Sequence, residues 1–278
     1  MDFTAAMGGG DLGTLALGLV IAGVVSGLVA GMLGVGGGIV VVPVMYQVLS
    51  AMHVPEDLRM HVAVGTSLAT IIPTSISSLR AHSKKGAVDW VLLRRWLAPM
   101  LVGVLAGSVL AGAARGQSLT IVFAVVAIPV AAFLAFGKET WRLSDHLPCG
   151  IGGLALPFGI GGVSTMMGIG GGVLGVSSMT LCGYPIHRAV GTASAFGAII
   201  SIPGAIGAAI AGWGAAGLPP YSLGYVNLLG FLLISPVAFF TAPAGAAFAH
   251  MADKNRLRKL FALFVAVTAA KMLWDALG

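Results

Sequence analysis

A glycine-rich motif occurs twice in the chain and constrains the fold more than any other feature. Residues 34–38 read Gly-Val-Gly-Gly-Gly, residues 168–172 read Gly-Ile-Gly-Gly-Gly, and each copy lies between two apolar segments. Four glycines in five residues are unfavourable inside a helix, because each costs about 1 kcal/mol relative to alanine. The string His-x-Ala-Val-Gly-Thr follows each motif, at 61–66 and at 187–192. The chain is therefore predicted to consist of two related halves, each with a broken helix.

The composition is that of a protein embedded in a lipid bilayer. Hydrophobic residues make up 58% of the chain and charged residues only 9%, whereas a soluble domain carries about 25% charged residues. Long runs of Gly, Ala, Leu and Val predict helices, and the period-two alternation of a membrane barrel is absent. Lys and Arg cluster at segment ends, which indicates membrane orientation and not nucleic-acid binding.

The distribution of basic residues predicts the topology. Basic stretches lie near 80–95, 138–142 and 254–259, whereas 114–117 and 212–221 carry little charge. Because cytoplasmic loops are enriched in Lys and Arg, the three basic stretches are expected on the cytoplasmic side. This assignment is consistent only if each glycine motif is the tip of a re-entrant hairpin that enters and leaves the membrane on one side. Ordinary spans with glycine kinks are the alternative interpretation.

The predicted fold is an all-α integral membrane protein with two inverted-topology repeats, residues 1–137 and 138–278, in one integrated membrane domain. Each repeat is a glycine-broken re-entrant helical hairpin followed by three transmembrane helices. Since three is odd, the halves have opposite orientations, as in many secondary transporters. The full spans are expected at 62–79, 91–113, 119–136, 189–211, 222–249 and 260–277.

The hairpins suggest a binding site for an anion. Each would place the amino end of a short helix, with its unpaired N–H groups and about half a positive charge, inside the membrane. Glycine lets the backbone approach an oxyanion closely, and nearby hydroxyl groups are further donors. Alternatively, the glycines serve helix packing and the hydroxyls bond their own backbone. The expected substrate-binding residues are Gly36, Gly37, Gly38, Ile39, Thr66 and Ser67 in the first half, and Gly170, Gly171, Gly172, Val173, Thr192 and Ser194 in the second.

Two histidines occupy equivalent positions in the halves. His61 and His187 each lie four residues before the glycine of the repeated string. Their functional interpretation is a proton-coupling group or a gate, and the structural one is an interfacial histidine that caps a helix. Arg188 either attracts anions at the mouth of the site or is one more cytoplasmic positive charge. Asn227 either reaches the site or bonds a neighbouring helix.

These motifs resemble the TauE/SafE family of membrane permeases, also called the sulfite exporter family. The resemblance covers nearly the whole chain and includes residues 27–38, 63–67 and 86–90 in the first half and 168–172, 191–194 and 224–227 in the second. It implies secondary transport of sulfur-containing anions such as sulfite, sulfoacetate or other organosulfonates, in the cell inner membrane. It leaves the anion and the direction of transport open.

Signatures of enzymes are absent from the sequence. It contains no Gly-x-x-x-x-Gly-Lys-[Ser/Thr], no His-Glu-x-x-His and no Gly-x-Ser-x-Gly, which argues against ATP hydrolysis, zinc hydrolysis and a serine nucleophile. We therefore expect no enzymatic activity, cofactor or metal, and we expect an alternating-access carrier driven by an ion gradient, with protons as the coupling ion. The alternatives are a passive anion channel and, less favoured, a membrane-embedded subunit or an enzyme without a recognisable motif.

Overall fold

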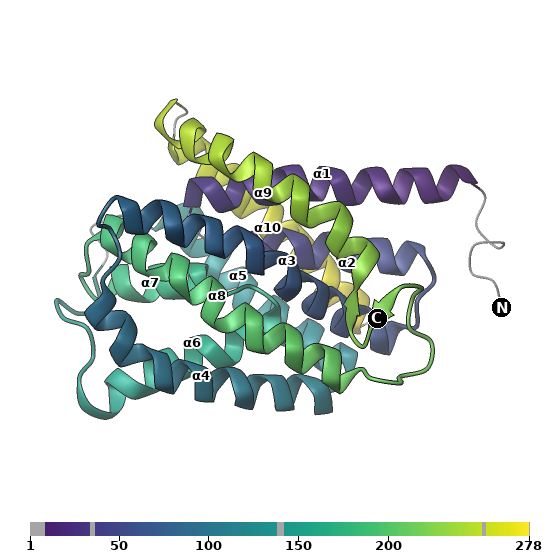
Figure 1. The fold of residues 1–278 in the computed structure, drawn as a ribbon, viewed down its shortest axis with the longest axis horizontal. Helices are drawn as coiled ribbons and strands as arrows, with labels where there is room; N and C mark the ends of the chain where they lie inside the picture. The colour runs from purple at the N-terminus through teal and green to yellow at the C-terminus, as the bar shows by residue number, and fades with distance from the viewer. Residues whose placement is uncertain (1–8, 34–36, 138–141, 252–253, 278) are drawn as a thin grey trace.

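The computed structural model describes residues 9–33, 37–137, 142–251 and 254–277, and these residues are helical apart from connecting turns and one small β-hairpin. Figure 1 shows the arrangement. The helices are α1 (Gly9–Leu33), α2 (Gly38–Ala51), α3 (Glu56–Lys84), α4 (Trp90–Ala113), α5 (Gly116–Phe136), α6 (Gly150–Met167), α7 (Gly172–Leu181), α8 (Ile186–Ala211), α9 (Leu228–Met251) and α10 (Lys254–Leu277), with strands β1 (Ser222–Leu223) and β2 (Val226–Asn227).

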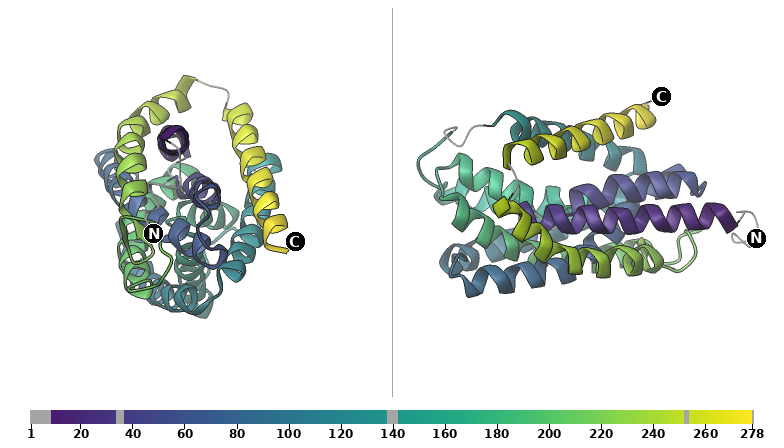
Figure 2. Two further views of the ribbon diagram at one scale, coloured as in Figure 1. Left: turned by 90° about the vertical axis from the view of Figure 1, so that its right-hand side faces the viewer. Right: turned by 90° about the horizontal axis from the view of Figure 1, so that it is seen from above.

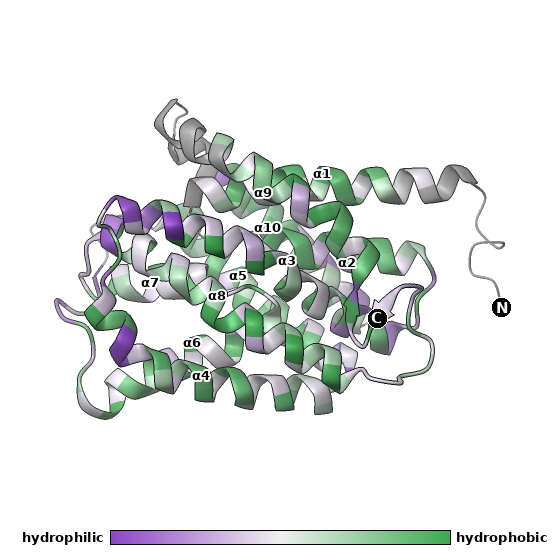
Figure 3. Ribbon diagram, viewed as in Figure 1, coloured by the Kyte–Doolittle hydropathy of each residue, from purple (hydrophilic) through white to green (hydrophobic). Residues whose placement is uncertain are grey.

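Six helices of the described part are long and apolar enough to cross a membrane: α3, α4, α5, α6, α8 and residues 259–277 of α10. Large apolar side chains on their outer surfaces are exposed, as Val109 (72%) and Trp274 (80%) illustrate, which suits contact with lipid. The hydrophilic colouring in Figure 3 gathers at the ends of the helices, most densely where α3 leads into α4. The prediction of an all-α, multi-pass membrane protein is confirmed.

Both predicted helix breaks are present. α1 ends at Leu33 and α2 begins at Gly38, while α6 ends at Met167 and α7 begins at Gly172. The second helix of each pair therefore starts one residue earlier than predicted. Gly171, the residue before α7, has a φ of 74°, a left-handed conformation that glycine adopts without a steric penalty.

The second helix of each pair turns back along the first. In Figure 1, α2 returns beside α1, and α7 runs back toward the end of the bundle at which α6 begins. The N–H of Leu143, shortly before α6, donates to the carbonyl of Leu181 at 2.8 Å, so α7 ends where α6 begins. The chain therefore reverses direction between α1 and α2 and between α6 and α7.

Three helix starts differ by six residues from the prediction, and one of them is α10, which begins at Lys254 and not at 260. α3 begins at Glu56 and not at 62, because Pro55 precedes it and acidic residues occupy its first turn, where they favour the helix dipole. The span expected over 222–249 instead starts with the β-hairpin, and α9 begins at Leu228. Asn227 caps α9, since its Oδ1 accepts a hydrogen bond from the N–H of Gly230 at 2.8 Å.

α3 and α8 pack against each other through the middle of the molecule. Around them, α1 packs on α9, α4 on α6 and α5 on α10, and Figure 2 shows α1 end-on between α9 and α10. The apolar window of α3 is 67% buried and that of α8 is 50% buried, against 28% for α4. The functional region is therefore expected where the two central helices meet the glycine turns.

Candidate functional site

The two glycine turns contact each other inside the bundle. A Cβ atom built on Gly38 would lie 2.5 Å from the carbonyl oxygen of Gly168 and 3.0 Å from the Cα of Ile169. Ser67 Oγ of α3 donates a hydrogen bond of 2.7 Å to the same Gly168 carbonyl. Segments more than a hundred residues apart therefore converge beside the middle of α3, with backbone against backbone.

The amino ends of α2 and α7 are both deeply buried. Ile39 is 0% exposed and Val173 is 3% exposed. The first N–H groups of any helix have no acceptor inside that helix, so both ends present donors and partial positive charge to the interior. The predicted binding residues Gly37, Gly38, Ile39, Gly170, Gly171, Gly172 and Val173 all lie at the two turns, and Gly36 lies outside the described residues.

Tight packing also requires these glycines. A Cβ on Gly170 would lie 2.9 Å from Ile71 Cγ2 of α3, and one on Gly171 would meet Ile200 of α8. The turns are held from both central helices, so the packing interpretation of the glycines and the binding interpretation apply to the same residues. Packing explains why these positions need glycine, and binding would use the N–H groups of the same residues.

The four hydroxyl groups that were predicted to bind substrate have different hydrogen-bond partners. Ser67 reaches a glycine turn, whereas Ser194 Oγ donates to the carbonyl of Gly191 in its own helix at 2.6 Å. Thr66 Oγ1 accepts the N–H of Asn227 at 2.9 Å, and Thr192 Oγ1 accepts the N–H of Asp89 at 2.9 Å. Each threonine thus joins a central helix to the residue that caps α9 or α4.

His61 is buried and surrounded by carbonyl oxygens. Its Nδ1 lies 2.8 Å from the Asp57 carbonyl, and its Nε2 lies 3.1 Å from the carbonyls of Ala111 and Ala114. Its ring packs against Tyr225 in a tilted arrangement, with centroids 4.7 Å apart. The last carbonyls of a helix lack intrahelical partners, so His61 caps the carboxyl end of α4 and not of its own helix.

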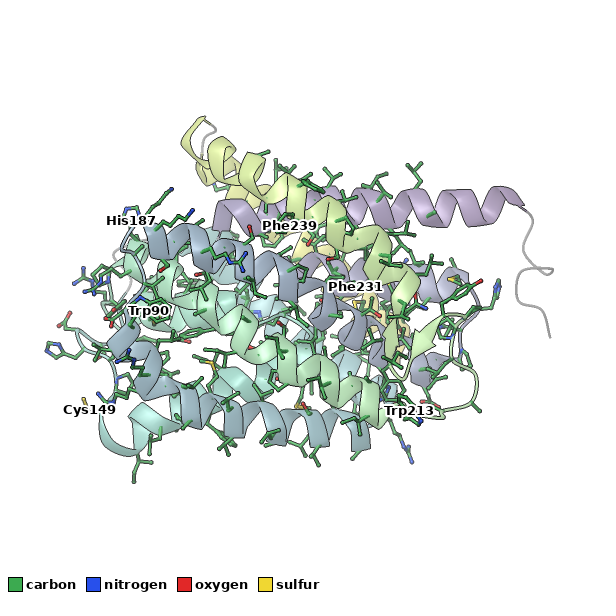
Figure 4. The ribbon with its side chains drawn as sticks, in the orientation of Figure 1. Trp90, Cys149, His187, Trp213, Phe231 and Phe239 are labelled. Atoms are coloured by element: carbon green, nitrogen blue, oxygen red, sulfur yellow. The ribbon has the colours of Figure 1, made fainter. Side chains whose placement is uncertain are left out.

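His187 has a different environment from its equivalent. It is exposed, and Figure 4 places it with Trp90 and Cys149 at one end of the bundle, with Trp213 at the other. Trp213 directly follows Gly212, whose built Cβ meets Tyr225, so His61 and His187 lie at opposite ends. The repeated string places one histidine at each end.

Arg188 belongs to a small polar cluster beside His187. Its guanidinium lies 3.5 Å from the carboxylate of Asp89, which also accepts hydrogen bonds from the Leu92 N–H and the Tyr184 hydroxyl. These backbone and hydroxyl donors, followed by Arg188, lower the pKa of Asp89. Burial, with a smaller contribution from Asp89, raises the pKa of Tyr184 to about 12. Arg188 is therefore partly neutralised by Asp89.

A small crevice of about 20 Å³ opens between the central helices and α4, a feature that sequence reasoning missed. Its walls come from five helices and the β-hairpin, so no sequence pattern marks it. It begins at His61 and Tyr225 and extends to Thr165 and Gly204, next to the second glycine turn. Within the described residues no group of three His, Cys, Asp or Glu side chains is placed to hold a metal ion.

The fold described above is that of a multi-pass helical membrane protein with two buried helix breaks. The family "Sulfite exporter TauE/SafE" matches residues 19–272. The chain belongs to this family and is a membrane transporter of that type.

Relatives with curated names agree with this assignment. A probable membrane transporter protein of Haemophilus influenzae is 34% identical over 256 residues, covering 91% of this chain and 96% of the relative. A probable membrane transporter protein of Methanocaldococcus jannaschii is 23% identical over 263 residues, covering 92% and 94%. No solved structure matches the chain.

Proposed function

We propose that the protein is a secondary transporter of sulfur-containing anions, such as sulfite, sulfoacetate or other organosulfonates, that works by alternating access in the cell inner membrane. The family name supports this proposal, and so do the burial of both helix amino ends and the contact of Gly38, at the start of α2, with Gly168 in the turn before α7. An anion in low dielectric needs donors and positive potential, and paired helix ends supply both without a buried cation.

Inverted repeats, with a boundary near residues 137–138, explain how the two glycine turns come to meet. Reciprocal contacts support this arrangement: α1 packs on α9 as α6 packs on α4. Likewise Thr66 of the first half bonds Asn227 of the second, and Thr192 of the second half bonds Asp89 of the first. Such a pair of swapped contacts is expected when two halves are related by a two-fold axis in the membrane plane.

Alternating access follows from a site that opens to one side at a time. The crevice beside His61 leads toward the glycine turns from one end of the bundle, while the contact of Gly38 with Gly168 closes the path between the turns. Separation of the turns would admit the anion and open the other side. Sliding or rocking of one repeat against the other is the usual way in which such transporters move.

His61 is the proposed proton-coupling gate. Both of its ring nitrogens face carbonyl oxygens, so a protonated ring donates on both sides, whereas a neutral ring leaves one nitrogen without a hydrogen to donate. Gain of a proton therefore tightens the contact of α3 with α4 and the β-hairpin at the mouth of the crevice. His187 and Arg188, with Asp89, occupy the opposite mouth, where we propose that they guide anions.

Reconstitution in liposomes tests the function directly. We expect saturable uptake of sulfite or sulfoacetate that a pH gradient accelerates, with protein-free liposomes and chloride as controls. Absence of flux for every sulfur-containing anion would overturn the proposal. Flux that does not saturate with concentration would instead indicate a passive channel.

A further inference from the structure

Three buried serine hydroxyls in the described part of the chain lack any hydrogen-bond partner: those of Ser108, Ser164 and Ser201. Buried polar groups in native proteins are nearly always paired, and an unpaired one calls for an explanation such as a ligand. Ser164 and Ser201 are both 0% exposed. Other buried serines, such as Ser75 and Ser194, bond a carbonyl of their own helix, so the three hydroxyls differ from their neighbours.

Ser164 lies directly before the second glycine turn. Its carbonyl accepts the N–H of Ile169 at 3.1 Å, so the residue is part of the turn. It is one helical turn beyond Ile160, whose Cγ2 lies 3.5 Å from a Cβ built on Gly171. Because residues four apart share a helix face, Ser164 faces the hairpin interior and the amino end of α7.

Ser201 approaches the same turn from α8. It lies four residues after Gly197, whose Cα is 3.6 Å from a Cβ built on Gly170, and three before Gly204, whose built Cβ is 3.3 Å from Thr165 Cγ2. These positions lie on one face of α8. Ser201 is thus flanked by two residues that border the second glycine turn, and it faces that turn.

The crevice connects this region to the end of the bundle that carries His61. Ser108, Thr165 and Gly204 all line it. Ser108 therefore provides an unpaired hydroxyl along the crevice wall, and Ser164 and Ser201 lie just beyond its inner end. The three hydroxyls mark a path from the mouth of the crevice to the amino end of α7.

We infer that Ser164 and Ser201 are substrate-binding residues that donate their hydroxyl hydrogens to an oxyanion bound at the amino end of α7. The inference deepens the proposed function and rests on it. Hydroxyl groups and helix N–H groups together supply the donors that oxygen atoms of a sulfonate or hydrogen sulfite require. The second half of the chain then holds the oxyanion more closely than the first, where the residue equivalent to Ser201 is the already paired Ser75.

The charge of the site favours an anionic group that carries a single negative charge, such as one sulfonate group, at the amino end of α7. Among the described residues no Lys, Arg, Asp or Glu side chain is buried, so the positive potential at the turns comes from the ends of α2 and α7. Each contributes roughly half a charge, which balances one negative charge and leaves a dianion such as sulfate uncompensated. Burial of an uncompensated charge is strongly unfavourable, so methanesulfonate is expected to bind better than sulfate.

Serine-to-alanine variants test the inference by binding measurements on the purified full-length protein. In S164A and S201A we expect the Kd for methanesulfonate to rise about tenfold or more, because each loses a hydrogen bond to a charged ligand. Their melting temperatures without anion should stay at or above the wild-type value, since an unpaired hydroxyl is removed. The control S75A loses a hydroxyl that already has a partner, and its Kd should equal that of the wild type.

The outcomes separate this inference from the proposed function. Wild-type affinity in both S164A and S201A, an equal loss in S75A, or unfolding of the two alanine variants would overturn the serine assignment alone. Equal affinity for sulfate and methanesulfonate would overturn the charge argument. A wild-type protein that binds neither methanesulfonate nor sulfite would overturn the serine assignment and the proposed function together.

Discussion

Replacement of Gly38 by alanine tests whether the two glycine turns meet. A Cβ on Gly38 would lie 2.5 Å from the Gly168 carbonyl oxygen, well inside an ordinary contact of 3.4–4 Å, and 2.7 Å from Ile71 Cδ1. The isoleucine methyl group is able to rotate away, but the carbonyl is backbone and is held by Ser67. Gly38→Ala must therefore push the turns apart.

The free-energy cost of Gly38→Ala follows from the clash that the added methyl group makes. Overpacking by one methyl group in a tight interior typically costs about 1–3 kcal/mol. Gly38 is the first residue of α2 and has no left-handed conformation, so alanine suits the backbone there and only the contact is penalised. A loss of this size lowers a melting temperature by about 2–4 °C per kcal/mol in a chain of this length. The same displacement should slow anion flux, because it alters a turn at which we propose that the anion binds.

Gly159→Ala is the matched control for Gly38→Ala. Gly159 lies in α6, and a Cβ built there meets nothing within 4 Å. Alanine at this position should leave the melting temperature unchanged or raise it, since alanine favours the helix by up to about 1 kcal/mol. Both variants are compared by thermal unfolding in detergent and by flux in liposomes. Equal stability and equal flux of the two variants would show that Gly38 and Gly168 are not in contact.

Three further substitutions test the polar contacts by thermal unfolding in detergent. His61→Ala leaves buried carbonyls without a donor and should cost about 1–3 kcal/mol; an unchanged melting temperature would rule out the cap on α4. Thr66→Val removes the acceptor for the N–H of Asn227 and should cost a similar amount, whereas no loss would show that the two halves are not joined there. Asp89 has a lowered pKa, so its stabilising contribution is present above the unfolded pKa of about 4 and is lost as the pH falls through the lower folded value. D89N should therefore lose less stability on acidification than the wild type, and parallel acid profiles would contradict this assignment.

Helix boundaries show which features of the fold can be predicted from neighbouring residues in the sequence. The breaks at 34–37 and 168–171 follow from glycine alone, because the residue's effect on a helix depends only on its own backbone. The start of α3 lies six residues before the predicted 62, and its first turn holds Glu56 and Asp57. Their position directly after Pro55 is a typical helix start, so this signal was present in the sequence.

The hydrogen-bond partners of the polar side chains could not be predicted from the sequence, because the tertiary structure decides them. Thr66 and Thr192 were expected to face a ligand or their own helices, but each accepts a backbone N–H from a residue more than a hundred positions away. No property of a threonine in an apolar span indicates such a partner. The unpaired hydroxyls of Ser164 and Ser201 were missed for the same reason, since whether a serine is paired depends on which helices pack around it.

The sequence by itself determined that the chain is helical, lies in a membrane and breaks two helices at glycine, because hydropathy and backbone preference are properties of neighbouring residues. Only the tertiary structure brought Gly38 against Gly168, and only it gave the same repeated string a buried histidine at 61 and an exposed one at 187. The physical reason is that burial, pairing and contact between distant turns depend on long-range packing, which a local sequence pattern does not specify.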